Sequence, residues 1–184
     1  YVNDVIYPIV SQGVHSNNAL DINNGSFAIC AVEGTTATGW IFKAFVTDGA
    51  TLKELTSSEI NNTSGSGHLH TWAHIALVRD SNLLYLFVNG VGVSIDIGAN
   101  YTIQDSSLKL SLGGWSDKGT PRTATNHYLD NVRIVNGDKE FTINGNNITV
   151  PTAPPVVGGT LVPANNLLLS TSSDNNSLIL NNAI

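Results

Sequence analysis

The sequence lacks several features that would assign a function directly. It has a single cysteine, Cys30, so an intrachain disulfide is impossible. Cys30 lies in the apolar run 27–32, where we expect a small buried hydrophobic residue and not a reactive thiol. There is no methionine, and we therefore expect a processed product or part of a longer polypeptide.

Charge is also scarce. Charged residues make up 12% of the 184 residues, about half the usual share. The formal net charge is −6, and the eight Lys and Arg residues are scattered. Nucleic acids and acidic membrane surfaces are not expected as partners, because both are bound by clustered positive charge. Asn, Ser, Thr and Gly supply the polar surface instead, as is typical of extracellular and virion proteins.

Long apolar runs and helical periodicity are nearly absent. No stretch approaches the roughly 18 apolar residues of a membrane span, and no signal peptide is visible. One or two helical turns are expected over residues 52–60 at most. Short β-branched and aromatic runs, separated by Gly, Asn, Asp and Ser, predict an all-β chain with strands at 2–10, 19–22, 27–32, 40–46, 72–79, 83–89, 91–97, 108–112, 128–135 and 141–150. Pro8 places the first of these strands at a sheet edge.

The strongest prediction is a three-stranded meander over residues 72–97. Asn89-Gly90 is a type I′ hairpin signal, because both residues tolerate positive φ. Alternation places Trp72, His74, Ala76 and Val78 on one face of the first strand and Ala73, Ile75 and Leu77 on the other. Both faces are largely apolar, so we expect this strand to be central and covered on both sides.

Proline and glycine mark a domain boundary. We expect a β-sandwich over residues 1–150, a Pro/Gly-rich linker over 151–163, and a C-terminal segment over 164–184. That segment contains two short apolar stretches around a polar centre. It is either a hairpin that returns to the sandwich or an arm that docks on a neighbouring subunit.

Four segments carry a family resemblance. They are Trp72 to Asp80, Leu84 to Gly90, Leu110 to Gly114, and Tyr128 to Ile134. Their order and motifs resemble laminin G-like domains of the concanavalin A-like type, with Asn131 where the family has an acid and His127 where it has Gly. The resemblance covers residues 65–137 firmly and 19–150 loosely. It implies an all-β, concanavalin A-like jelly-roll sandwich of two antiparallel sheets, here with an extended C-terminal arm, in which Trp72 fills the core.

A second resemblance concerns the setting of the domain. Phe141 and the prolines at 151–155 follow the last motif, as they do in laminin G-like modules of tailed-bacteriophage virion proteins. This implies a virion structural role.

Catalytic patterns are missing from the sequence. Concanavalin A-like glycosidases carry alternating acids on one strand, which places an acid and a nucleophile on one face. Here Asp138 and Glu140 are the one close i, i+2 acidic pair, and they follow Gly137 in a loop. Serine hydrolase, Walker and zincin motifs are absent too. We therefore expect no enzymatic activity.

Candidate binding residues remain. An exposed aromatic beside polar groups can bind a glycan, and Trp115, Asp117 and Tyr101 are the candidates, although core or rim packing is the more usual role of such rings. His68 and His70 form a His-x-His pair that could hold a transition metal, with a polar loop as the alternative. No cofactor is expected. Calcium, a family trait, is the alternative, and its candidate ligands are Asp80, Asp96, Asp117 and Asp130.

The sequence thus favours a virion structural protein, either a capsid decoration protein or a fibre or tail subunit, whose partners are other virion proteins or copies of itself. The alternative is a secreted or cell-surface adhesin that binds glycans. The expected assembly contacts are the apolar residues near both ends, namely Ile6, Tyr7, Leu167, Leu168, Leu169, Leu178, Ile179 and Leu180.

Overall fold

The fold is described from a computed structural model of the chain. The structure describes residues 6–16, 19–36, 39–61, 72–116, 128–135, 141–152, 167–171 and 178–182, the last two ranges by their backbone alone. The elements in these ranges are strands, which confirms the all-β prediction. Among the described residues, no helix is long and apolar enough to span a membrane.

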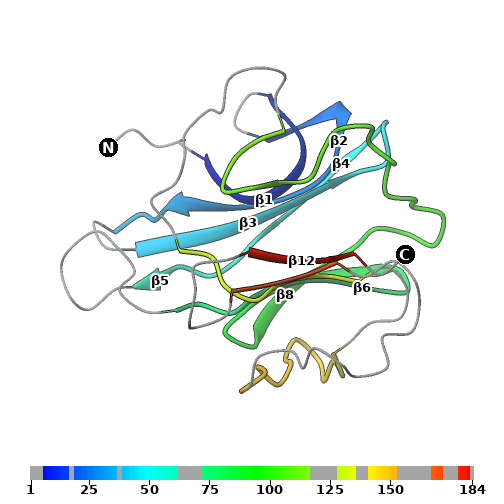
Figure 1. The fold of residues 1–184 in the computed structure, drawn as a ribbon. Coiled ribbons are helices and arrows are strands. Elements are labelled where there is room, and N and C mark those ends of the chain that lie inside the picture. Colours follow the sequence, from blue (N-terminus) through cyan, green and yellow to red (C-terminus); the bar gives the residue numbers. More distant parts are fainter. Residues whose placement is uncertain are drawn as a thin grey trace.

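The first layer is a six-stranded antiparallel sheet. Its order is β4-β3-β2-β1-β9, and β5 pairs with β3 beside this path. The strands are β1 Ile6–Ser16, β2 Ala19–Glu33, β3 Gly39–Thr47, β4 Leu52–Thr56, β5 Ile60–Asn61 and β9 Ser111–Leu112. Figure 1 shows β1 to β4 as the upper layer of the molecule.

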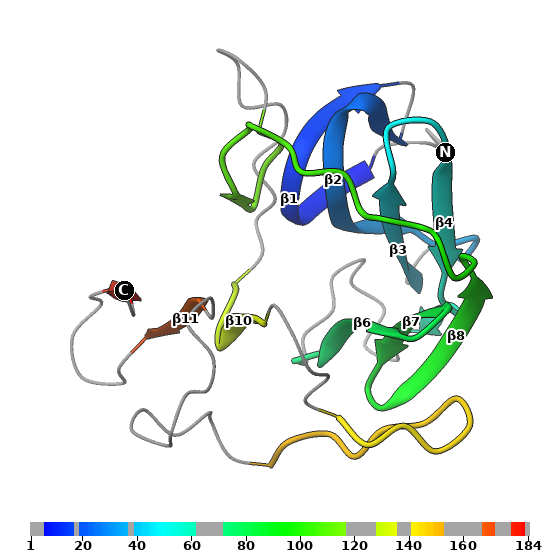
Figure 2. The same cartoon turned by 90° about the vertical axis from the view of Figure 1, so that its right-hand side faces the viewer.

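The second layer contains the expected meander. Strands β6 Ile75–Asp80, β7 Leu83–Val88 and β8 Val91–Asp96 form a three-stranded antiparallel sheet. A further three-stranded sheet consists of β10 Val132–Ile134, β11 Leu167–Thr171 and β12 Leu178–Asn182. In Figure 2, β10 and β11 lie beyond β6, on the side away from β8. The C-terminal segment is therefore a hairpin that pairs with the chain's own β10.

Strand alternation distributes the buried side chains over three clusters. The central core lies between the layers and combines alternate residues of β3, such as Phe42 and Val46, with Leu84, Leu86 and Val88 of β7. A second cluster covers the outer face of the first sheet. A third lies on the outer face of β6 and β7, where the segment 141–148 covers it (Figure 1). The molecule is thus a sandwich with an apolar cluster outside each main sheet.

The expected helix at 52–60 is wrong. Residues 52–56 form β4, which pairs with β3 in the register Leu55↔Ala44. Leu55 enters the central core through this pairing. A helical propensity over one or two turns is weak, and tertiary pairing with a preformed edge overrides it.

The expected edge position of the first strand is also wrong. β1 lies between β2 and β9, so it is an interior strand. Pro8 is accommodated because the β1–β2 register shifts between Pro8 and Val10, and because β9 reaches only Val10 and Ser11. A bulge tolerates the missing proline N–H that a regular ladder would require.

The prediction for the first meander strand is confirmed in part. Ile75 and Leu77 pack on the central core and Ala76 and Val78 on the outer cluster, so both faces are covered as expected. The central position, however, belongs to β7, and β6 pairs with β7 alone among the described strands. Trp72 does not fill the core. It precedes β6 and is 70% exposed.

Candidate binding surface

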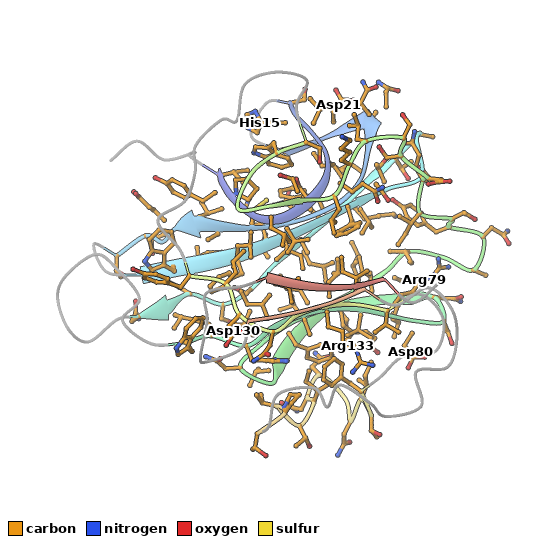
Figure 3. The ribbon with its side chains drawn as sticks, in the orientation of Figure 1. His15, Asp21, Arg79, Asp80, Asp130 and Arg133 are labelled. Carbon is orange, nitrogen blue, oxygen red and sulfur yellow. The ribbon has the colours of Figure 1, made fainter. Side chains whose placement is uncertain are left out.

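Trp115 is a core residue. Its side chain is 4% exposed and packs with Ile6, Leu20 and Phe45 in the cluster outside the first sheet. The His15 ring lies 5.3 Å away, centroid to centroid. The expectation that Trp115 offers a glycan platform is therefore wrong, since sugar stacking needs an exposed ring face. Figure 3 shows His15 in the upper layer, at the top of the molecule.

Tyr101 is buried as well, at 6% exposure. Its hydroxyl donates to the carbonyl oxygens of Val46 at 3.0 Å and Thr51 at 3.1 Å. Burial raises the pKa of this hydroxyl, and the nearby charge of Asp48 raises it further. Tyr101 thus joins the segment after β8 to β3. The prediction that Tyr101 binds a glycan is wrong, because its ring is buried like that of Trp115.

Several candidates fall elsewhere. Asp117, His68 and His70 lie outside the described residues, so the proposed metal pair stays a prediction. Among the described residues, His, Cys, Asp and Glu form no group of three that could hold a metal ion. Asp80 and Asp130 lie toward opposite ends of the lower layer in Figure 3, so they do not share a calcium site.

Two exposed aromatic residues replace the buried candidates. Trp72 is 70% exposed and Tyr128 is 89% exposed. Arg79 and Asp80, at the end of β6, lie at one end of the lower layer, and Asp130 lies toward the other (Figure 3). In the chain, Trp72 lies three residues before β6, and Tyr128 lies two residues before Asp130. The sequence pattern placed both residues inside expected strands, whereas β6 begins at Ile75 and β10 at Val132.

Three of the described carboxylates, those of Glu59, Asp48 and Asp21, hold backbone N–H groups. The clearest case is Glu59, which accepts from the hydroxyl groups of Thr35, at 2.7 Å, and Thr36. It also accepts from their backbone N–H groups at 3.2 and 3.1 Å. These bonds, the Thr36 hydroxyl first, lower the pKa of Glu59 to about 2.

Asp48 acts in the same way on the bend between β3 and β4, and Asp21 acts within β2. Asp48 accepts from the backbone N–H groups of Thr51 at 2.7 Å and Ala50 at 2.9 Å. These bonds lower the pKa of Asp48. Asp21 accepts from the backbone of Asn23 and Asn24. A general acid needs a raised pKa, so the lowered pKa values of Glu59 and Asp48 suit these two side chains to holding the backbone and not to donating a proton.

The N-terminal contact candidates have different environments. Ile6 is buried in the chain's own outer cluster. Tyr7 is half-buried, and its hydroxyl donates to Glu33 Oε1 at 3.3 Å while its ring tilts on Trp40 at 5.9 Å. Tyr7 is therefore the one of the two that still reaches the surface.

The C-terminal candidates are placed by backbone register. Leu167, Leu168 and Leu169 pair with Ile134, Arg133 and Val132 of β10. Across the hairpin, Leu178, Ile179 and Leu180 pair with Thr171, Ser170 and Leu169. Cross-strand partners share a face of a sheet. Leu169 and Leu180 therefore occupy register positions on the same face as Val132, which packs against the central core.

The sandwich and its motifs define the protein class. A family model of the concanavalin A-like lectin/glucanases superfamily, of the laminin G type, matches residues 14–155. The chain belongs to this family. Comparisons with curated proteins and with solved structures found no match. The family region begins inside β1 and ends before β11, so most of β1 and the whole C-terminal hairpin lie outside it.

Proposed function

We propose that this chain is a non-enzymatic structural module that makes protein–protein contacts in a virion, as a capsid decoration protein or a fibre or tail subunit. The observation that carries the proposal is the hairpin β11–β12, which pairs with β10 in a separate sheet and lies beyond the family region. Its outer strand, β12, is a sheet edge among the described strands. An edge strand presents backbone N–H and C=O groups to which a partner strand can add.

Two further features support this role. The carboxylates of Glu59, Asp48 and Asp21 accept hydrogen bonds from backbone N–H groups, which favours a structural module over a hydrolase. The sparse charge and the Phe141-to-proline continuation are those of the virion modules that the sequence resembles. The partners would be other virion proteins or copies of this chain.

A truncation tests the proposal. A chain that ends at Val150 lacks the hairpin β11–β12. It retains the residues of the three described apolar clusters. We expect it to lose binding to its native particle, or self-association, in sedimentation and electron microscopy. Val91→Ser is the matched control, because Val91 is an exposed apolar residue on the β8 edge. Intact assembly of the truncated chain, with native tryptophan fluorescence, would contradict the proposal.

A second candidate, glycan recognition, is favoured by the exposed rings of Trp72 and Tyr128. Aromatic faces stack on the apolar faces of sugar rings, and exposed aromatic rings suit an adhesin. We expect a glycan screen to give binding that Trp72→Ala and Tyr128→Ala both abolish and Val91→Ala leaves unchanged. A broad screen without binding would remove this candidate.

A further inference from the structure

Three Asn-Gly pairs lie within the described residues, at 24–25, 89–90 and 144–145. Asparagine before glycine is chemically the most vulnerable amide in a protein, because the glycine nitrogen can reach the side-chain carbonyl carbon without steric hindrance. The reaction needs a side-chain amide that is free to turn and a glycine N–H that no acceptor holds. The three positions satisfy these requirements to different extents. A fourth pair, at Asn136, lies outside the described residues.

Two of the three asparagines are held. The backbone N–H and the Nδ2 of Asn24 both donate to Asp21 Oδ1, at 2.8 and 3.2 Å. The Oδ1 of Asn89 accepts from the backbone N–H of His74 at 2.9 Å, and the Asn89 N–H donates to the His74 carbonyl at 2.8 Å. In both cases the amide must leave a hydrogen bond before it can react.

Asn144 differs in the environment of its side chain. Its side chain is exposed and has no hydrogen-bond partner among the described residues. The backbone bonds of its turn join Asn144 and Asn147, at 2.9 and 3.1 Å, and leave the Gly145 N–H out. Gly145 has φ +58° at the first central position, as in a type II′ turn, and nothing lies within 4 Å of where its Cβ would be.

We propose that Asn144 is a built-in site of spontaneous deamidation. The Gly145 nitrogen attacks Cγ of Asn144, loses its proton to solvent base, and forms a cyclic imide as the side-chain nitrogen leaves as ammonia. Water then opens the ring. Cleavage of the Cγ–N bond gives aspartate, and cleavage of the bond to the main-chain carbonyl gives isoaspartate. The net change is amide plus water to carboxylic acid plus ammonia, with no oxidation or reduction.

The reaction alters a segment that covers a sheet edge. The Asn146 carbonyl accepts from the Gly92 N–H at 2.8 Å, and the Ile148 N–H donates to the Gly90 carbonyl at 2.9 Å. Residues 144–148 therefore cover the start of β8, and Ile148 is a buried member of the outer cluster. Isoaspartate lengthens the backbone by one carbon within the two-residue turn. It should break this register and expose the β8 edge, whereas aspartate adds only a charge.

Peptide mapping by mass spectrometry tests the site. The full chain is incubated folded in mildly alkaline buffer, and amide loss is followed at the three asparagines, with fragmentation that distinguishes aspartate from isoaspartate. We expect Asn144 to react several-fold faster than Asn24 and Asn89. The advantage should vanish in denaturant, where the three share the same local chemistry. Equal or faster reaction of Asn89 or Asn24 in the folded chain would overturn the assignment.

Amide hydrogen exchange tests the consequence. The isoaspartate product should lose several-fold protection at the Gly92 N–H, while Asn144→Asp, which keeps the normal backbone, should retain it. Asn144→Gln, which forms the cyclic imide poorly, should remain protected after the same incubation. Unchanged exchange at Gly92 in the isoaspartate product would refute the loosening of the edge.

Discussion

At the scale of single residues, the three tryptophans occupy different environments. Trp40 lies in the central core and Trp115 in the cluster outside the first sheet, while Trp72 is exposed. Removing a buried tryptophan costs about 3–5 kcal/mol, because the cavity and the lost apolar burial add together. Exposed positions without special contacts change stability by about 0.5 kcal/mol or less.

We therefore expect Trp40→Ala and Trp115→Ala to lower the free energy of unfolding by about 3–5 kcal/mol each. Trp72→Ala should leave it nearly unchanged, and it serves as the internal control. Urea unfolding followed by circular dichroism measures all three. A large loss with Trp72→Ala would show that its ring packs on the chain after all.

Glu59 makes the stability of the fold depend on pH. Its folded-state pKa is lowered from the ordinary value of 4.5 to about 2. A lowered pKa stabilises the fold above the unfolded pKa, and this contribution is lost as pH falls from about 4.5 through about 2. We expect Glu59→Gln to unfold more easily at neutral pH and to show a shallower loss of stability across that window. Urea midpoints measured against pH check this, and parallel curves for both proteins would contradict it.

At the scale of elements, the β7–β8 hairpin shows how turn chemistry and neighbouring segments act together. Asn89 and Gly90 have φ +50° and +86°, which confirms the predicted Asn-Gly turn. A Cβ on Gly90 would also lie 2.8 Å from the Ile148 carbonyl oxygen. Gly90 thus permits both the turn and the close approach of the segment that covers β8.

Two glycine substitutions separate these effects. Gly145→Ala should cost about 1–2 kcal/mol, because an alanine is strained in the left-handed region. Gly90→Ala should cost more, because the backbone of Ile148 must also move. Equal losses in urea unfolding would show that the close approach has no energetic role.

At the scale of the whole molecule, Cys30 reports on opening of the sandwich. It is fully buried among Ile6, Ala28 and Phe45 on the outer face of the first sheet. Burial raises the pKa of its thiol above the ordinary value, and the Lys43 charge offsets this only in part. The reactive thiolate is therefore scarce in the folded chain.

We expect Cys30 to resist alkylation in the native state and to react rapidly in denaturant. The native rate should follow the free energy of unfolding in Trp115→Ala, which removes a member of the same cluster. Timed alkylation with intact-mass detection measures it. Rapid native labelling would mean that the outer cluster opens without global unfolding.

Much of the fold was predictable from local patterns. The alternation at 75–78 assigned both faces of β6, and Asn89-Gly90 assigned a hairpin. The exposure of the candidate binding residues was not predictable in this way. Trp72, Trp115 and Tyr101 are all aromatic residues near strand ends, and their exposure depends on which distant segment covers them.

The sequence alone determined the all-β class, the meander, the family motifs and the absence of a basic patch, because period-two alternation, turn residues and charge are local properties. Tertiary structure decided that residues 52–56 pair with β3, that Pro8 lies in an interior strand, and that Trp115 is buried while Trp72 is not. Each of these outcomes depends on contacts between residues far apart in the chain. Long-range packing determines these outcomes, and no local sequence pattern encodes that packing.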